Sequence, residues 1–178
     1  MRPSINIKYI LITGLAVVLS FFFHELAHWA TGELLGYTMG MTLNSAFLTE
    51  GEYHTAWHSN LISAAGPLFT ILTAFLFFYV IRKTKNKYWY PFLFFAFYSR
   101  LMAMIVSIFN PNDEARISAW LGLGYWILPL IVCFTLLFLL IKTSKEQEYS
   151  LKFNLINYLL ASVFVAGVVF SDQYFLNN

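Results

Sequence analysis

Residues 9–30 read YILITGLAVVLSFFFHELAHWA, an apolar stretch that ends in two histidines and a glutamate. A helix of about 20 mostly apolar residues crosses the hydrocarbon core of a bilayer, which is about 30 Å thick. This stretch is therefore predicted to be a transmembrane helix. A basic start before an apolar run is also typical of a secretory signal peptide. No small-residue cleavage site follows promptly, so we favour the spanning helix.

The composition of the whole chain fits the same environment. Of the 178 residues, 59% are hydrophobic and 11% are charged, whereas a soluble domain carries about 25% charged residues. Four more segments are apolar and long enough to cross a bilayer, namely residues 61–81, 88–109, 119–141 and 153–170. We expect an all-α integral membrane protein with about five transmembrane helices, organised as a single polytopic domain over residues 1–178.

Charge and cysteine content exclude several other classes of protein. The net charge of +2 is too small to indicate a nucleic-acid partner. The lipid bilayer is the partner that the apolar composition indicates. The one cysteine, Cys133, lies inside an apolar run. An intramolecular disulfide and a zinc site built from several thiolates are therefore excluded.

Basic residues mark one side of the predicted bundle. Nine of the eleven Lys and Arg residues precede the first span or lie in the second and fourth connections: Arg2, Lys8, Arg82, Lys83, Lys85, Lys87, Lys142, Lys145 and Lys152. Cytoplasmic loops are rich in Lys and Arg, so we expect a cytoplasmic N-terminus, an outside C-terminus and a plasma-membrane location. Arg116 falls in an outer loop. Arg100 falls within a span, where it is expected to pair with an acid or to snorkel.

The residues that indicate a catalytic metal site lie at the end of the first span, in the sequence His24-Glu25-Leu26-Ala27-His28. Residues i and i+4 share one face of a helix, so both imidazoles can bind one metal ion, with Glu25 beside them as a general base. Zinc lowers the pKa of a bound water to about 7 and so creates a nucleophile at neutral pH. His24 would lie about 22 Å along the helix, within the hydrocarbon layer. Ionisable residues there indicate a functional site; the alternative is an interfacial position with hydrogen bonds to headgroups or neighbouring helices.

The segment between the first two spans is different in character. Residues 32–60 contain several glycines and polar residues and no run long enough to span. Alternation over residues 37–48 is typical of a short β-hairpin, or the segment could be re-entrant. His54 and His58 form a second i,i+4 pair without an intervening glutamate. They are expected to belong to a polar lead-in to the second span, while a second metal site or a proton relay stays open.

Three elements in order resemble the site-2 protease family of intramembrane zinc metalloproteases. The first is the His24–His28 motif, the second is the sequence SAAGPL at residues 63–68, and the third is Asn-Pro-Asn-Asp at residues 110–113. The resemblance covers roughly residues 10–120, which implies a catalytic core over about residues 9–120 and two additional helices at 119–141 and 153–170. The resemblance is to a short form of the family, one without a PDZ-like domain.

The resemblance also implies roles for individual residues. It implies Zn²⁺ as the cofactor, bound by His24 and His28 with Asp113 as the third ligand and Glu114 as the alternative third ligand. It further implies that three residues bind substrate: Gly66, Pro67 and Asn110. The chain departs from the family pattern in two places, with Thr70 where an Asn is usual and Glu114 where a Gly is usual.

These observations predict a zinc metalloprotease that cleaves membrane-embedded or membrane-proximal peptide substrates, with Glu25 as the catalytic base. Two alternatives stay open. Water activated by a metal does not dictate which bond is attacked, so the substrate could be a membrane molecule other than a peptide. The departures at Thr70 and Glu114 would also suit a non-catalytic membrane protein that binds partners or zinc through a degenerate site.

Overall fold

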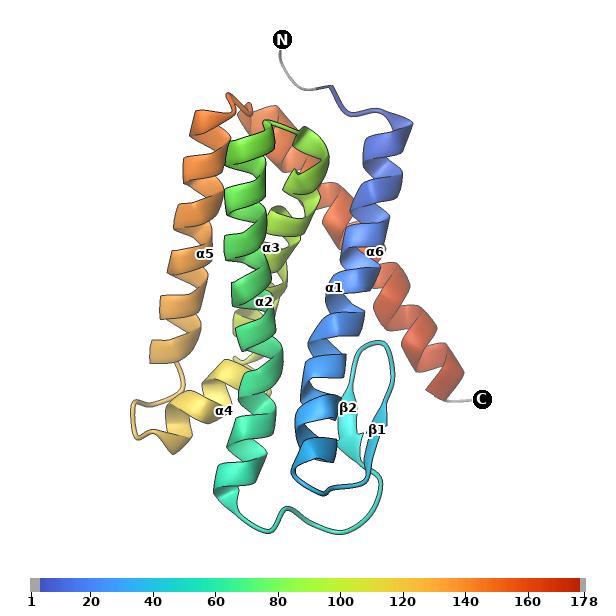
Figure 1. Ribbon diagram of the computed structural model, residues 1–178, viewed down its shortest axis with the longest axis vertical. Helices are drawn as coiled ribbons and strands as arrows, with labels where there is room; N and C mark the ends of the chain where they lie inside the picture. Colours follow the sequence, from blue (N-terminus) through green and yellow to red (C-terminus); the bar gives the residue numbers. More distant parts are fainter. Residues whose placement is uncertain (1–3, 177–178) are drawn as a thin grey trace.

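The computed structural model describes residues 4–176, which form a bundle of helices with one small hairpin (Figure 1). Arg2, one of the nine residues used to predict the orientation, lies outside the described residues. Within the described residues, five helices are long and apolar enough to span a membrane. The prediction of an all-α, multi-pass membrane protein is therefore confirmed. In chain order, the elements are α1 (Ile7–Leu34), β1 (Met39–Met41), β2 (Ala46–Leu48), α2 (Ala56–Thr84), a 3₁₀ turn (Lys87–Trp89), α3 (Tyr90–Val106), α4 (Asp113–Trp120), α5 (Ile127–Glu146) and α6 (Leu151–Leu176).

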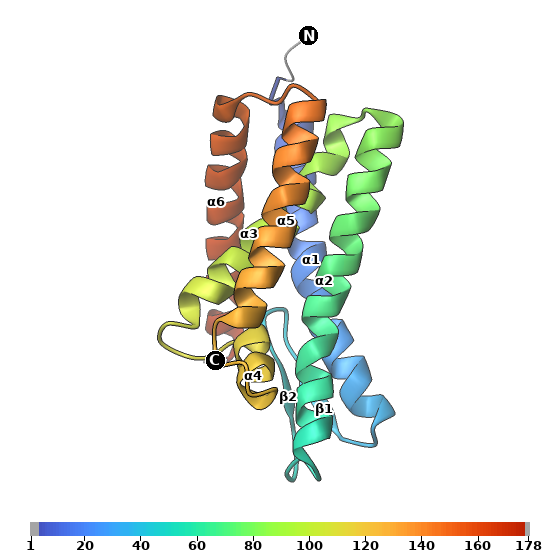
Figure 2. The same cartoon turned by 90° about the vertical axis from the view of Figure 1, so that its left-hand side faces the viewer.

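The long helices lie side by side, and the connections at the two ends of the bundle differ in kind. The start of α1, the turn between α2 and α3 and the turn between α5 and α6 lie at one end (Figure 1). The hairpin and the short helix α4 lie at the other end, as the view turned by 90° also shows (Figure 2). The end that holds the connecting turns carries most of the basic residues. There Arg82 pairs with Glu146 at 2.7 Å.

The bundle has a core of aromatic and aliphatic side chains and a polar seam near its basic end. Tyr9, Tyr90 and Leu136 are fully buried in this core. The Tyr9 hydroxyl donates to Asn157 Oδ1 at 2.7 Å, which joins α1 to α6. Hydrogen-bonded polar residues between helices help to hold such a bundle together in lipid, where apolar burial alone does not discriminate one contact from another.

The hairpin predicted within residues 37–48 is confirmed. β1 and β2 are antiparallel, with Met39 opposite Leu48 and Met41 opposite Ala46. The irregular segment around the hairpin is shorter than the expected 32–60, because α1 continues to Leu34 and α2 already begins at Ala56. The Thr55 hydroxyl caps α2 by accepting from the backbone N–H of His58 at 3.2 Å, which satisfies a donor that the helix itself leaves unpaired.

The expected helix over residues 119–141 is wrong at its start. Ala119 and Trp120 end α4, and the membrane-crossing helix α5 begins only at Ile127. Gly122 and Gly124 between them have φ angles of 74° and 76°, a left-handed conformation that glycine adopts without steric cost and that interrupts a helix. The expected third span, residues 88–109, likewise ends early, at Val106.

Candidate metal centre

The two histidines of the first span lie on one face of α1 and point at the same space. Their Nε2 atoms are 3.1 Å apart. The His24 and His28 side chains are buried, with 7% and 6% of their surface exposed. The i,i+4 spacing brings the rings together, because residues four apart are neighbours on one face of a helix.

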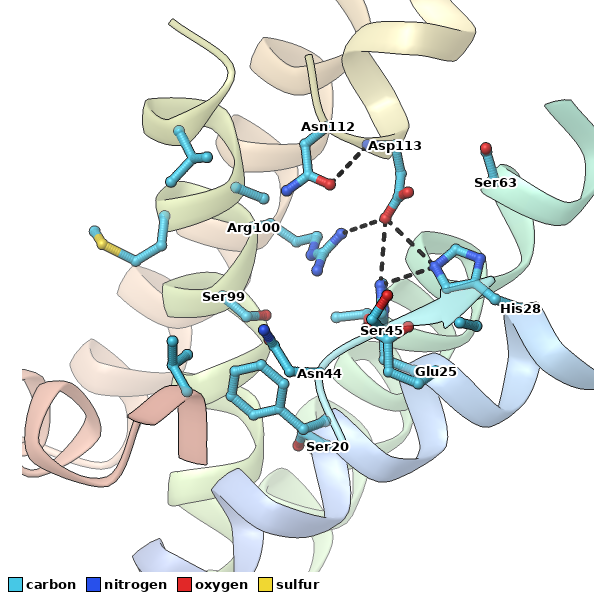
Figure 3. Close-up of a pocket in the computed structure, with 18 of the residues that line it drawn as sticks. Ser20, Glu25, His28, Asn44, Ser45, Ser63, Ser99, Arg100, Asn112 and Asp113 are labelled. Carbon is cyan, nitrogen blue, oxygen red and sulfur yellow. Dashed lines mark hydrogen bonds and ion pairs between the residues drawn. The ribbon is translucent and has the colours of Figure 1, made fainter. Parts of the chain in front are cut away.

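Asp113 reaches the same space from a distant part of the chain. After α3 ends, Pro111 prevents a helix from continuing through this point, and Asn112 caps α4 by accepting from the backbone N–H of Asp113 at 2.9 Å. Asp113 is thus the first residue of α4, and its carboxylate points from there toward the histidines (Figure 3). Its Oδ2 atom lies 3.3 Å from His24 Nε2 and 3.4 Å from His28 Nε2.

The three facing atoms fit the edges of a zinc coordination tetrahedron. Ligand atoms placed about 2.0–2.1 Å from Zn²⁺ in tetrahedral geometry lie about 3.3–3.4 Å from one another. The distances among His24 Nε2, His28 Nε2 and Asp113 Oδ2 are 3.1, 3.3 and 3.4 Å. Two imidazoles and one carboxylate also match the donor set of catalytic zinc sites, which keep a fourth position open for water.

The outer nitrogens of both imidazoles are engaged, which determines what the inner nitrogens can do. The backbone carbonyl of Ile62 can only accept, so His28 Nδ1 donates to it at 2.6 Å. The Thr70 hydroxyl donates to the Gly66 carbonyl at 3.1 Å and therefore accepts from His24 Nδ1 at 3.0 Å. A neutral imidazole that donates through Nδ1 offers a lone pair at Nε2. Two such lone pairs then face a carboxylate oxygen, an arrangement that a bound cation stabilises.

Replacing Thr70 with valine is expected to weaken zinc binding by about 10- to 100-fold, because His24 would lose the partner that orients it. Valine keeps the shape of threonine and removes only the hydroxyl. Competition with a chromogenic chelator would measure the affinity. Thr73→Val is the matched control, since among residues 4–176 the Thr73 hydroxyl bonds to carbonyls of its own helix, Phe69 O and Thr70 O. Equal zinc affinities for the two variants would contradict this role of Thr70.

Gly66 allows α2 to approach the histidines closely. A Cβ atom at this position would lie 2.3 Å from His28 Nε2 and 2.6 Å from His24 Cε1. Real Cβ atoms essentially never make such short contacts. Glycine is therefore required at position 66 wherever both imidazoles keep this geometry.

Basic side chains lie beside both oxygens of Asp113. Arg116 Nη2 donates to Asp113 Oδ1 at 2.7 Å and to Ser63 Oγ at 3.1 Å. Arg100 Nη1 lies 3.8 Å from Asp113 Oδ2. Two guanidinium groups beside this carboxylate favour its ionised form, so the carboxylate is available to a cation.

The candidate metal centre opens onto a cavity of about 570 Å³ between α1, α2, α3 and the hairpin turn. Glu25 lines this cavity beside the histidines and is 8% exposed. Its carboxylate faces the backbone N–H of Ala46, at the start of β2. Asn44 and Ser45 also line the cavity (Figure 3). The cavity thus places a carboxylate and several polar groups next to the three metal-ligand atoms.

The other residues singled out in the sequence lie in several places. Glu114 does not face the histidines; its Oε1 atom accepts from Arg100 Nη1 at 3.1 Å, which identifies the acid that pairs with Arg100. Pro67 is buried within α2 beside Gly66. Asn110 is exposed and is absent from the described residues that line the cavity, whereas Asn112 is among them.

The second histidine pair lies away from the metal centre. The Tyr37 hydroxyl bonds to His58 Nδ1 at 2.8 Å and accepts from the backbone N–H of His54 at 2.9 Å. Tyr37, which follows the end of α1, therefore connects that end to the segment at the start of α2. The sequence alone did not indicate Tyr37 or the contact of Thr70 with His24, because both depend on which elements become neighbours. The contacts of Asn112 and Arg116 with Asp113 are local to the start of α4, and the i,i+3 spacing of Asp113 and Arg116 could have indicated the second.

Comparison with known proteins finds a distant similarity. It is similar to a protein of Methanocaldococcus jannaschii named "Putative zinc metalloprotease MJ0611", with 25% identity over 142 residues. The similarity covers 66% of this chain and 74% of that relative. No protein-family model and no solved structure matches the chain.

Proposed function

We propose that this protein is a zinc metalloprotease that hydrolyses peptide bonds of substrates within or next to the membrane. The observation that carries the proposal is the convergence of His24, His28 and Asp113, in zinc-like geometry, beside the buried carboxylate of Glu25. A site that only bound zinc would have no use for a carboxylate in this place. The similarity to a protein named as a zinc metalloprotease supports the same class.

The proposed mechanism assigns the proton transfers to this chain's own residues. A bound zinc ion would supply a water of pKa about 7 and polarise the scissile carbonyl. Glu25 accepts the proton of the attacking water and returns it to the nitrogen of the leaving amine. Thr70 and the Ile62 carbonyl keep both imidazoles in the orientation that directs Nε2 inward. The surrounding helices bury Glu25 and both histidines, which strengthens each of these interactions.

The position of the centre supports a membrane-level substrate. His24 lies about 26 Å along α1 from its first residue, which is within the span of a bilayer if that end of α1 lies at the inner surface. The cavity is also lined by apolar side chains of α3 and α6, such as Phe95 and Val165. A peptide segment at this depth would meet both apolar walls and the polar groups of the centre.

Replacing Glu25 with glutamine is the experiment that tests this function. The purified protein is expected to hold one zinc ion per chain in both forms, measured by elemental analysis. Glutamine cannot accept the proton, so cleavage of a single-span substrate is expected to fall by about 100- to 10,000-fold. Glu50→Gln, at an exposed position, is the control and should cleave at the normal rate.

Two results would count against this proposal. Cleavage by Glu25→Gln within tenfold of the unaltered protein would remove Glu25 from the mechanism. A zinc-replete protein that is inert on a broad panel of single-span substrates would favour a non-peptide substrate or a binding function.

We propose an orientation in which the N-terminus and the basic end of the bundle are cytoplasmic, in the plasma membrane. The arrangement of Lys and Arg at that end supports it. On a Cys133→Ala background, Glu52→Cys is expected to react with a membrane-impermeant maleimide in intact cells. Lys85→Cys should react only after the cells are opened, since it lies at the opposite end of the bundle and is exposed there. The reverse labelling pattern would invert the orientation.

A further inference from the structure

Arg100 is a buried cation beside the metal centre that the proposed chemistry has not yet used. It lies in α3, lines the cavity and has 7% of its surface exposed. Its guanidinium points from α3 toward the carboxylate of Asp113 (Figure 3). A charge in the middle of a membrane-spanning helix is costly and usually marks a function.

The contacts of Arg100 leave part of its guanidinium without a partner. Nη1 donates to Glu114 Oε1 at 3.1 Å. Within residues 4–176, the buried Nε–H of Arg100 has no hydrogen-bond acceptor. Such buried unpaired donors are rare in proteins and call for an explanation. An acceptor supplied by a bound substrate would satisfy this donor.

Arg100 is not needed to hold Asp113 in place. Arg116 already binds Asp113 Oδ1 at 2.7 Å, and Asn112 receives the backbone N–H of the same residue. The 3.8 Å between Arg100 Nη1 and Asp113 Oδ2 is an ion-pair distance, too long for a hydrogen bond. The buried carboxylate of Glu114 bonds to Nη1 and so offsets the charge of Arg100. This carboxylate does not contact the histidines. The guanidinium is thus anchored by Glu114, and its Nε–H stays available.

We propose that Arg100 donates a hydrogen bond to the carbonyl oxygen of the scissile peptide bond and stabilises the negative charge that develops there. This inference rests on the proposed protease function. The water oxygen bonds to the carbonyl carbon, and the carbonyl π electrons move onto the oxygen that Arg100 faces. The water proton goes to Glu25, the C–N bond then breaks, and Glu25 passes the proton to the leaving nitrogen. Arg100 keeps all its protons, because a guanidinium is not deprotonated in proteins.

In this proposal Glu114 orients the guanidinium of Arg100. Arg100 is the side chain that Glu114 binds, at 3.1 Å. A guanidinium presents several N–H groups in a rigid plane. Binding one of them to Glu114 therefore fixes the direction of the others. A preoriented donor of this kind stabilises developing charge without reorganising during the reaction.

The test compares Arg100→Gln with the double variant Arg100→Gln, Glu114→Gln, using Arg82→Gln at the exposed basic end as the control. The first readout is the Kd of a phosphonate analogue of a cleaved peptide, whose tetrahedral anion resembles the transition state. The second is the Kd of a hydroxamate of the same sequence, which binds mainly through the metal. The third is zinc content.

Both variants are expected to bind the phosphonate about 100-fold more weakly and to lose about 100- to 1,000-fold in kcat. Zinc content and hydroxamate affinity should stay within about threefold of the unaltered protein, and KM should change far less than kcat. Arg100→Lys should recover part of the phosphonate affinity, because it restores a cationic donor with a different shape.

The double variant distinguishes a catalytic donor from a mere charge partner. It removes both charges together, so it avoids leaving Glu114 buried and unpaired. Recovery of phosphonate affinity and kcat in the double variant would overturn the inference and make Arg100 a charge partner of Glu114. Unchanged phosphonate affinity in Arg100→Gln would also overturn it. An unaltered protein without zinc-dependent, Glu25-dependent cleavage would instead overturn the proposed function, and this inference with it.

Discussion

Replacing Gly66 with alanine is expected to abolish zinc binding. The new methyl group would lie 2.3 Å from His28 Nε2 and 2.7 Å from His24 Nε2, the two atoms that face the metal. Neither ring can simply move aside, because His28 Nδ1 is bound to the Ile62 carbonyl and His24 Nδ1 to Thr70. We expect zinc affinity to fall by more than about 100-fold, beyond the range seen when only an orienting partner is lost. Elemental analysis and chelator competition would measure it.

Gly167→Ala is the matched control for this experiment. Gly167 also lies in a membrane-spanning helix, α6, and a Cβ atom there would meet nothing within 4 Å. The control should keep its zinc and gain about 0.5–1 kcal/mol in helix stability. If Gly66→Ala bound zinc as tightly as Gly167→Ala, the close approach of α2 to the histidines would not be required for the metal centre.

Replacing Asp113 with asparagine is expected to remove zinc from the protein while leaving both histidines in place. The amide keeps the shape of the carboxylate but lacks the negative charge that attracts the metal and the two arginines. Arg100 keeps its ion pair with Glu114 and Arg116 is half exposed, so neither arginine is left as a buried unpaired charge. A loss of zinc is therefore expected, with a lower melting temperature because a ligand that stabilises the folded form is gone, measured by elemental analysis and thermal unfolding.

Asp172→Asn provides a comparison at the same end of the bundle. Asp172 accepts from Thr42 Oγ1 at 3.0 Å and from the backbone N–H of Leu43 at 3.2 Å, so it joins α6 to the hairpin turn. It is not part of the group of three metal-ligand residues. This variant should keep a full complement of zinc. Zinc retained at normal affinity by Asp113→Asn would show that the third ligand is another group.

Much of the bundle could be predicted because lipid imposes a simple requirement on sequence. A spanning helix must be apolar over about 20 residues, and each long helix of the structure met that requirement. The start of α5 was missed because hydropathy does not register backbone conformation. Trp120, Leu121 and Leu123 are apolar and read as part of a span, yet the positive φ angles of Gly122 and Gly124 turn the chain there.

The candidate site was predictable where its geometry is local. The spacing of His24 and His28 on one helix is enough to bring their rings together. The pairing of Arg100 with Glu114 was not predictable, because it depends on how the chain turns between α3 and α4. Gly66 could be singled out, but its contact with the imidazoles follows from how α1 packs on α2. Asn110 was expected to bind substrate, whereas Asn112 lines the cavity, because the turn before α4 decides which side chain faces it.

The three side chains of the candidate metal centre are at positions 24, 28 and 113, so the α2 and α3 segments separate the two histidines from the aspartate in the sequence. During synthesis, the histidines therefore enter the membrane well before the aspartate exists, and two membrane-crossing segments must take their places first. A zinc ion held by all three side chains would act as a cross-link between an early and a late part of the chain. Because a ligand that binds only the assembled form stabilises it, metal loading would serve as the closing step of assembly and would hold α4 against α1.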